Sequence, residues 1–123
     1  MQSTLLVSLL ALSAVALAGC TGGSSDFETP PMDDQGRYVI EMVGTRFEPA
    51  NAQVPVGATV LWVYVSGGAH DVQANDGSFS SGAPGDMDSS NPEWERTFDA
   101  AGTIDYHCAF HGRTVMPGTL KVA

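Results

Sequence analysis

The chain has 123 residues, with 14 acidic against 5 basic side chains and a formal net charge of −9. This length suits one domain. The negative charge argues against nucleic acid as a partner, because no basic patch is available to neutralise phosphates. It also argues against adsorption to anionic lipid by charge alone. The acidic side chains are scattered along the sequence, which favours a solvating surface over a patch that steers a basic partner.

The first 19 residues carry no charged side chain, and residues 5–18 are apolar apart from two serines. Such a run is too short to span a bilayer and is typical of a secretory signal. The small residues before Cys20 resemble a lipoprotein cleavage site, where the cysteine is lipidated and becomes the new N-terminus. We therefore expect a signal peptide over residues 1–19 and an extracytoplasmic protein anchored to the membrane by lipid on Cys20. One feature departs from the pattern, because no Lys or Arg precedes the apolar run. A retained anchor helix is the alternative.

Residues 20–35 are rich in Gly, Ser, Pro and Asp and show no hydrophobic periodicity. This composition predicts a flexible tether, which leaves residues 36–123 for the folded domain. Two cysteines in an exported chain usually suggest a disulfide. A bridge between Cys20 and Cys108 would tie the tether to the domain, but each cysteine has another explanation.

Short segments rich in β-branched and aromatic residues follow one another through the domain, with Gly and Pro at the junctions. The clearest are residues 38–43, 59–65, 103–108 and 118–122, and the weaker ones are residues 52–55, 70–74 and 94–99. This pattern predicts an all-β domain, a Greek-key antiparallel β-sandwich. Residues 76–92 are polar and irregular, so we expect a loop there, with Met87 exposed to solvent.

A cluster of metal-ligating residue types stands near the C-terminus. Cys108, His111 and Met116 follow one another within residues 106–118, and His70 is the only histidine outside that segment. Two histidines, one cysteine and a weakly bound methionine make up the ligand set of a blue-copper site. Thiolate and thioether suit Cu(I), while imidazole binds both oxidation states. In isolation, Cys108 would fit core packing, His111 a surface position and His70 a turn.

The spacing Cys108-x2-His111-x4-Met116, with His70 placed 38 residues before the cysteine, resembles the ligand loop of plastocyanins and halocyanin-like proteins of the cupredoxin family. The resemblance extends back through residues 47–50, 54–57 and 59–62 and so covers the whole predicted domain.

The resemblance implies one mononuclear type 1 copper, held by His70, Cys108, His111 and Met116. It also implies that the protein passes single electrons between redox proteins of an electron-transport chain. The apolar rim around His111 would be the docking face for those partners; its members are Ala109, Phe110, Val115 and Pro117.

Two departures from the plastocyanin pattern concern the tuning of the copper. Asp71 stands where plastocyanins have an Asn that braces the ligand loops, and an ionised Asp can accept hydrogen bonds but cannot donate them. Phe110 stands where they often have Pro. Because Phe110 has a backbone N–H, we expect it to donate to the Cys108 sulfur and to raise the reduction potential.

A third departure is His107, at a position where plastocyanins often carry a Tyr that has been implicated as an electron route. Side chains alternate across a strand, so we expect His107 to point away from the metal that Cys108 faces.

Two other classes of protein compete with an electron carrier. A copper chaperone would bind Cu(I) reversibly at a site rich in Met or His. A copper enzyme such as a nitrite reductase would need a second copper centre, which three histidines cannot supply. We therefore expect no catalytic activity.

Overall fold

A computed structural model describes residues 26–123 of the protein. The predicted signal peptide over residues 1–19 and the predicted lipidation site at Cys20 lie outside these residues. Within residues 26–123, no helix is long and apolar enough to cross a membrane.

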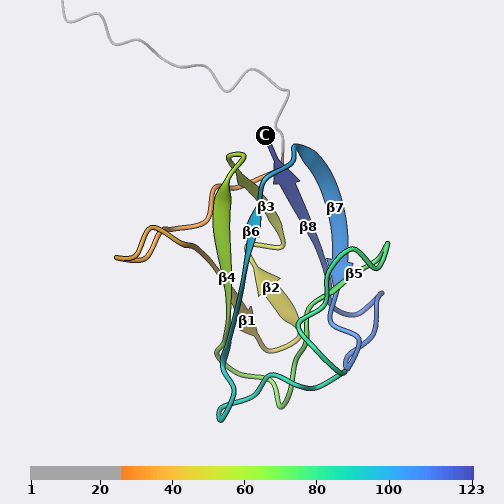
Figure 1. The fold of residues 1–123 in the computed structure, drawn as a ribbon. Coiled ribbons are helices and arrows are strands. Elements are labelled where there is room, and N and C mark those ends of the chain that lie inside the picture. Colours follow the sequence, from red (N-terminus) through yellow and green to blue (C-terminus); the bar gives the residue numbers. More distant parts are fainter. Residues whose placement is uncertain (1–25) are drawn as a thin grey trace, which may run out of the picture.

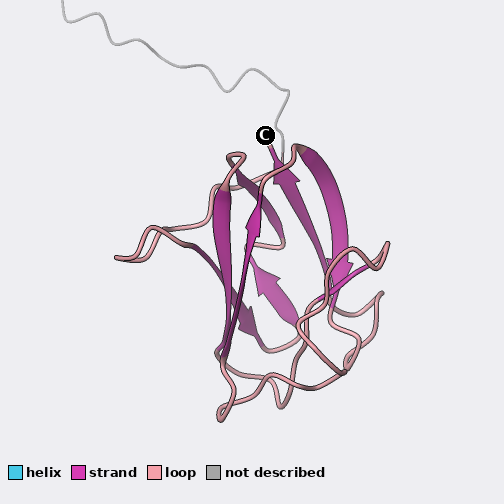
Figure 2. Ribbon diagram, viewed as in Figure 1, coloured by secondary structure: helices cyan, strands magenta, loops and turns pink. Residues whose placement is uncertain are grey.

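Two four-stranded sheets pack face to face, and the secondary structure of the described residues consists of strands and loops (Figure 1, Figure 2). The sheet orders are β2-β1-β4-β6 and β3-β8-β7-β5. The strands are β1 (Tyr38–Val43), β2 (Arg46–Glu48), β3 (Asn51–Val54), β4 (Ala58–Tyr64), β5 (Gln73–Ala74), β6 (Glu93–Phe98), β7 (Gly102–His107) and β8 (Pro117–Val122). The predicted β-sandwich is confirmed, and the four clearest predicted segments match β1, β4, β7 and β8 to within one residue at each end.

The strand pairing is mixed, where the sequence predicted an antiparallel sandwich. β1 pairs parallel with β4, and β3 pairs parallel with β8, while the other pairs are antiparallel. Both parallel pairs join strands that are distant in the sequence. The chain leaves the first sheet after β2, adds β3 to the second sheet and returns as β4 beside β1, a crossover long enough for parallel pairing.

The sequence pattern missed β2, which has three residues. Phe47 is buried and lies between exposed Arg46 and Glu48, whose side chains form an ion pair at 2.6 Å. The alternation is correct for a strand, but it is too short to stand out against its neighbours. Pairing with β1 across a tight turn is what makes this segment a strand.

Aromatic side chains fill the space between the sheets. Trp62 of β4 lies at the centre, with ring centroids of four aromatic neighbours 5.3 to 6.2 Å away in tilted or edge-on geometry. Separations of this size are favourable for aromatic pairs. The four neighbours are Phe79, Trp94, Phe98 and Tyr106.

The predicted loop over residues 76–92 contributes to this core, which corrects the expectation that Met87 is exposed. Met87 is only 1% exposed and Phe79 only 4%. The physical reason is a backbone pairing that the sequence pattern does not show. Met87 and His70 exchange both of their backbone hydrogen bonds, at 2.7 and 2.8 Å, and this draws the loop inward.

The described part of the predicted tether is packed on the domain. Glu28 donates its N–H to the Asn51 carbonyl and accepts from Gln53, so it covers the free edge of β3. Phe27 lies beneath the ammonium group of Lys121, 5.7 Å from the ring centroid. Unpaired backbone groups on an edge strand favour the addition of such a segment, even one of polar composition.

One close contact on the inner face of the second sheet requires glycine. Tyr106 of β7 pairs with Gly118 of β8, and the fully buried Tyr106 ring lies across the Gly118 backbone. A Cβ atom at position 118 would meet two ring carbons and the hydroxyl oxygen of Tyr106 at 2.4 to 2.7 Å. No side chain fits there unless Tyr106 moves.

We therefore expect Gly118→Ala to lower the free energy of unfolding by about 2 kcal/mol, the scale of overpacking in a dense core. Chemical denaturation gives this value. In a Tyr106→Leu background, the same substitution should cost at least ~1 kcal/mol less, because the obstructing ring is gone. An equal loss in both backgrounds would show that Tyr106 is not what position 118 has to accommodate.

Candidate metal centre

Three loops gather at one end of the sandwich, away from the C-terminus (Figure 1). They follow β4, β5 and β7, and the first and third carry all four predicted copper ligands. His70 lies in the loop after β4, whereas Cys108, His111 and Met116 lie between β7 and β8. The middle loop contributes Met87, which pairs with His70.

The loop between β7 and β8 is closed by backbone hydrogen bonds. His107 and Pro117 form the last pair of the two strands, and the Cys108 N–H donates to the Met116 carbonyl at 3.0 Å. Within the loop, Gly112 donates to the Cys108 carbonyl at 2.9 Å and accepts from the Met116 N–H at 3.0 Å. Cys108 and Met116 are therefore fixed side by side.

The loop that carries His70 is attached to the turn between β1 and β2. The backbone N–H groups of Val65 and Ser66 both donate to the Met42 carbonyl, and the Ser66 hydroxyl accepts from the Gly44 N–H at 3.0 Å. Gly67 then passes directly over the Gly44 carbonyl, with no room for a side chain. These contacts hold the chain three residues before His70.

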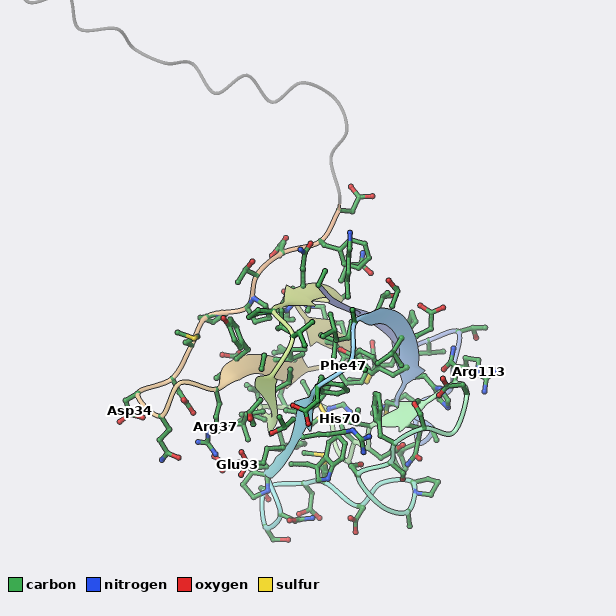
Figure 3. All side chains as sticks on the ribbon, turned by 45° about the horizontal axis from the view of Figure 1, so that its top comes forward. Asp34, Arg37, Phe47, His70, Glu93 and Arg113 are labelled. Atoms are coloured by element: carbon green, nitrogen blue, oxygen red, sulfur yellow. The ribbon has the colours of Figure 1, made fainter. Side chains whose placement is uncertain are left out.

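The side chains of His70, Cys108 and His111 come together at this end. Their ligand atoms all lie within 4.8 Å of one another. The Cys108 Sγ atom lies 3.9 Å from Nδ1 of His70 and 3.5 Å from Nδ1 of His111. His70 and Cys108 are fully buried, while His111 is partly exposed. Figure 3 shows His70 enclosed by other side chains, whereas Arg113 of the same end projects outward.

The hydrogen bond of His70 leaves one ring nitrogen free for a metal. Nε2 lies 2.6 Å from the Ser66 carbonyl, which can only accept, so Nε2 carries the proton. Nδ1 then has a free lone pair directed toward Cys108. Burial lowers the pKa of His70, which further favours the neutral ring that binds metal. Burial raises the pKa of Cys108, so the thiol is protonated until a metal displaces the proton.

Two methionines are buried beside this cluster. The backbone of Met116 is hydrogen-bonded to that of Cys108, and the backbone of Met87 is hydrogen-bonded to that of His70. The backbone of Met116 is thus held next to Cys108, and its role as the axial ligand stays a prediction. The burial of Met87 had no signal in the sequence, because it depends on pairing across the loops.

His107 lies outside the cluster, in agreement with strand alternation. Its Nδ1 atom is 2.5 Å from Oδ1 of Asn75, and the ring is 9% exposed. Both residues belong to the second sheet or its adjoining turn. Burial lowers the pKa of His107, so the ring is neutral near pH 7.

Asp71 links the loops around the cluster. Its carboxylate accepts the N–H groups of Ala109 at 2.8 Å, Phe110 at 2.9 Å and Gly85 at 3.1 Å. Burial by itself raises the pKa of Asp71, but these three donors, together with the Gln73 side chain, outweigh burial and the pKa is lowered. The carboxylate is therefore ionised in the folded protein.

The partner of the Phe110 amide corrects an expectation from the sequence. We expected this N–H to donate to the Cys108 sulfur, but it donates to Asp71. The backbone amides that lower the pKa of Cys108 are those of His111 and Asp71. The Phe110 amide therefore binds Asp71 rather than the sulfur.

The donor set is suited to copper that alternates between two oxidation states. Two imidazole nitrogens and a thiol sulfur face one another, with a buried thioether residue adjoining, and this mixture accommodates both Cu(I) and Cu(II). A β-sandwich with such a cluster at one end defines the class of small blue-copper proteins, the cupredoxins. The profile described as "Copper binding proteins, plastocyanin/azurin family" matches residues 36–123. The chain belongs to this family, whose members bind one copper.

Individual relatives agree with this assignment. Amicyanin of Paracoccus denitrificans is 30% identical over 119 residues, which cover 89% of this chain and 91% of the relative. Plastocyanin of Scenedesmus fuscus is 30% identical over 83 residues, covering 62% of this chain and 85% of the relative. Halocyanin of Natronomonas pharaonis is 35% identical over 80 residues, covering 64% of this chain and 49% of the relative.

Solved structures resemble this fold. A mutant amicyanin in the reduced state superposes with a TM-score of 0.61 at 29% identity, covering 78% of this chain and 93% of that one. The Cu(I) form of another amicyanin mutant gives a TM-score of 0.61 at 28% identity, with the same coverage.

Two adjacent glycines allow a test of how the His70 loop is held. Gly67 and Gly68 both have positive φ, at +107° and +85°, so alanine is strained at either position. Only at Gly67 would the added Cβ meet backbone, 2.0 Å from the Gly44 oxygen. We expect Gly67→Ala to lose at least ~2 kcal/mol more stability than Gly68→Ala and to weaken copper binding as well. Denaturation and copper titration of both variants would measure this, and equal effects would contradict it.

Proposed function

We propose that this protein is a blue-copper electron carrier, in which His70 and His111 supply imidazole nitrogens, Cys108 the thiolate and Met116 a weak axial sulfur. The observation that carries the proposal is the convergence of two Nδ1 atoms on the Cys108 sulfur, all within 4.8 Å. When bound, copper supplies a one-electron couple between Cu(II) and Cu(I). The protein then transfers electrons and transforms no substrate.

The ligand frame suits this role because hydrogen bonds within the protein hold its residues in place. Backbone bonds fix Cys108 to Met116, and the Ser66 carbonyl fixes the ring of His70. Side chains that are already oriented need little rearrangement when the charge of a bound ion changes by one. A low reorganisation energy of this kind suits fast electron transfer better than tight, selective storage of copper.

An apolar rim around His111 supports brief contact with redox proteins. Phe110 and Val115 are each 55% exposed, and Pro117 is exposed beside them. The Phe110 ring stands edge-on to the His111 ring, with the centroids 5.1 Å apart. A partner that docks on this rim would be separated from the proposed copper ligand His111 by one side chain, that of Phe110. Small contacts of this type suit weak, transient redox complexes.

The two competing functions receive less support. A copper enzyme with a second centre needs further histidines, and the third histidine, His107, is bonded to Asn75 outside the cluster. A chaperone that releases Cu(I) would gain little from a fully buried Cys108 held between two histidines.

We further propose that the protein acts outside the cytoplasm, held to the membrane by lipid on Cys20. The support is the apolar run over residues 5–18 and the small residues before Cys20. The net charge of −9 makes electrostatic binding to anionic lipid unfavourable, so lipid would have to supply the membrane affinity.

Replacement of the thiolate tests the copper site. The full wild-type chain, loaded with Cu(II), should show the intense visible band of thiolate-to-copper charge transfer. Cys108→Ser should abolish this band, because a hydroxyl cannot replace the thiolate. Cys20→Ser is the matched control, the same exchange at the other cysteine, and should keep the band. A band of undiminished intensity in Cys108→Ser would show that Cys108 is not a copper ligand.

The mass of the mature protein tests the anchor. Protein extracted from membranes should begin at Cys20 and carry the added mass of a lipid, and Cys20→Ser should yield either an uncleaved precursor or a soluble protein. Intact mass spectrometry with fractionation distinguishes these forms. A mature chain that begins at another residue, with no added mass, would contradict the anchor.

A further inference from the structure

The carboxylate of Asp71 is a buried charge at the centre of the candidate copper site. The residue is 0% exposed, and its Oδ1 atom lies 3.5 Å from the Cys108 sulfur. Among the described residues, the ion pairs of Arg37 and Arg46 involve other acids, and no Lys or Arg pairs with Asp71. Its charge is balanced by hydrogen-bond donors, chiefly the backbone N–H groups of Gly85, Ala109 and Phe110.

The surroundings of Asp71 fit a carboxylate and not an amide. Gly85 and Phe110 donate to Oδ1, and Ala109 donates to Oδ2. Both terminal atoms of the Asp71 side chain, Oδ1 and Oδ2, therefore have to be hydrogen-bond acceptors. An Asn in this position would place its NH₂ group against at least one N–H, whichever way the amide is turned. A carboxylate satisfies all three donors.

We propose that Asp71 is a positioning residue that holds a fixed negative charge beside Cys108. This charge favours Cu(II) over Cu(I). The reduction potential of the site is therefore lower than it would be with a neutral side chain at position 71. The proposal rests on the proposed copper function. The charge is effective because it is enclosed by protein, where neither water nor salt screens it fully.

The sign follows from the charge balance of the redox step. A donor protein adds one electron and an acceptor protein removes it, while Asp71 forms and breaks no bond. The net charge of the site falls by one on reduction. A fixed anion nearby is therefore attracted more strongly to the oxidised site than to the reduced one. The three N–H groups weaken this effect but do not reverse it, because they would remain in an uncharged variant.

The test compares variants of the full chain by voltammetry and by competition titrations that give the Kd for Cu(I) and for Cu(II). Asp71→Asn should raise the ratio of the Cu(II) Kd to the Cu(I) Kd at least tenfold, which is a rise of about 59 mV in the reduction potential. Asp71→Glu keeps the charge and should leave the ratio within about threefold of wild type, even if both affinities fall. Asp105→Asn removes an exposed carboxylate from β7 and should also leave the ratio within about threefold.

A purely structural role would weaken both affinities alike and leave their ratio unchanged in Asp71→Asn, which would overturn the proposal. A shift no larger than that of Asp105→Asn would also overturn it. Thermal unfolding of the metal-free variants shows whether they fold, and Asp71→Ser takes the place of Asp71→Asn if the latter does not. A wild type that binds no copper would refute the proposed function itself. A blue wild type with an unchanged ratio in the variant would refute only the role of Asp71.

Discussion

The register between β7 and β8 is the constraint on which the rest of the site depends. His107 faces Pro117 in the last pair, and the bond from Cys108 to the Met116 carbonyl closes the loop directly beyond it. Once this hairpin is formed, three of the four candidate ligands are placed by local geometry alone. A shift of one residue in the pairing would turn Cys108 to the opposite face and destroy the cluster. The buried Tyr106 ring, which fits only over Gly118, supports the same register from within the core.

His70 is the exception, because it has to be brought to the hairpin by contacts across the sandwich. The Met42 carbonyl and the Gly44 backbone hold the chain before His70. Met87 holds the backbone of His70 itself through two hydrogen bonds. The groups of the cluster carry little charge of their own, because burial favours a neutral His70 ring and a protonated Cys108, while Asp71 is ionised. A polar network of this kind stays stable in an apolar interior only when each member has a partner. In this site, most of the partners are backbone groups.

The parts of the structure that could be predicted from the sequence are those that depend on local pattern. Alternation and β-branched residues indicated β1, β4, β7 and β8, and the spacing from Cys108 to Met116 indicated the ligand loop. The features that were missed depend on contacts between distant segments. The strand around Phe47, the parallel pairing of β3 with β8 and the burial of Met87 all belong to this group. The same holds for the Phe110 amide, whose partner Asp71 comes from another loop.

The packing of Phe27 against Lys121 fixes where the described chain enters the domain. Lys121 lies near the end of β8, whereas Pro117, at its start, borders the metal cluster. Four residue-to-residue steps of extended strand separate the two positions, roughly 13 Å along the strand. An attachment to an electrode or bead through the N-terminal side would thus leave the rim of Phe110 and Val115 facing the solution. For measurements of electron exchange with a dissolved partner, that orientation keeps the proposed docking rim unobstructed.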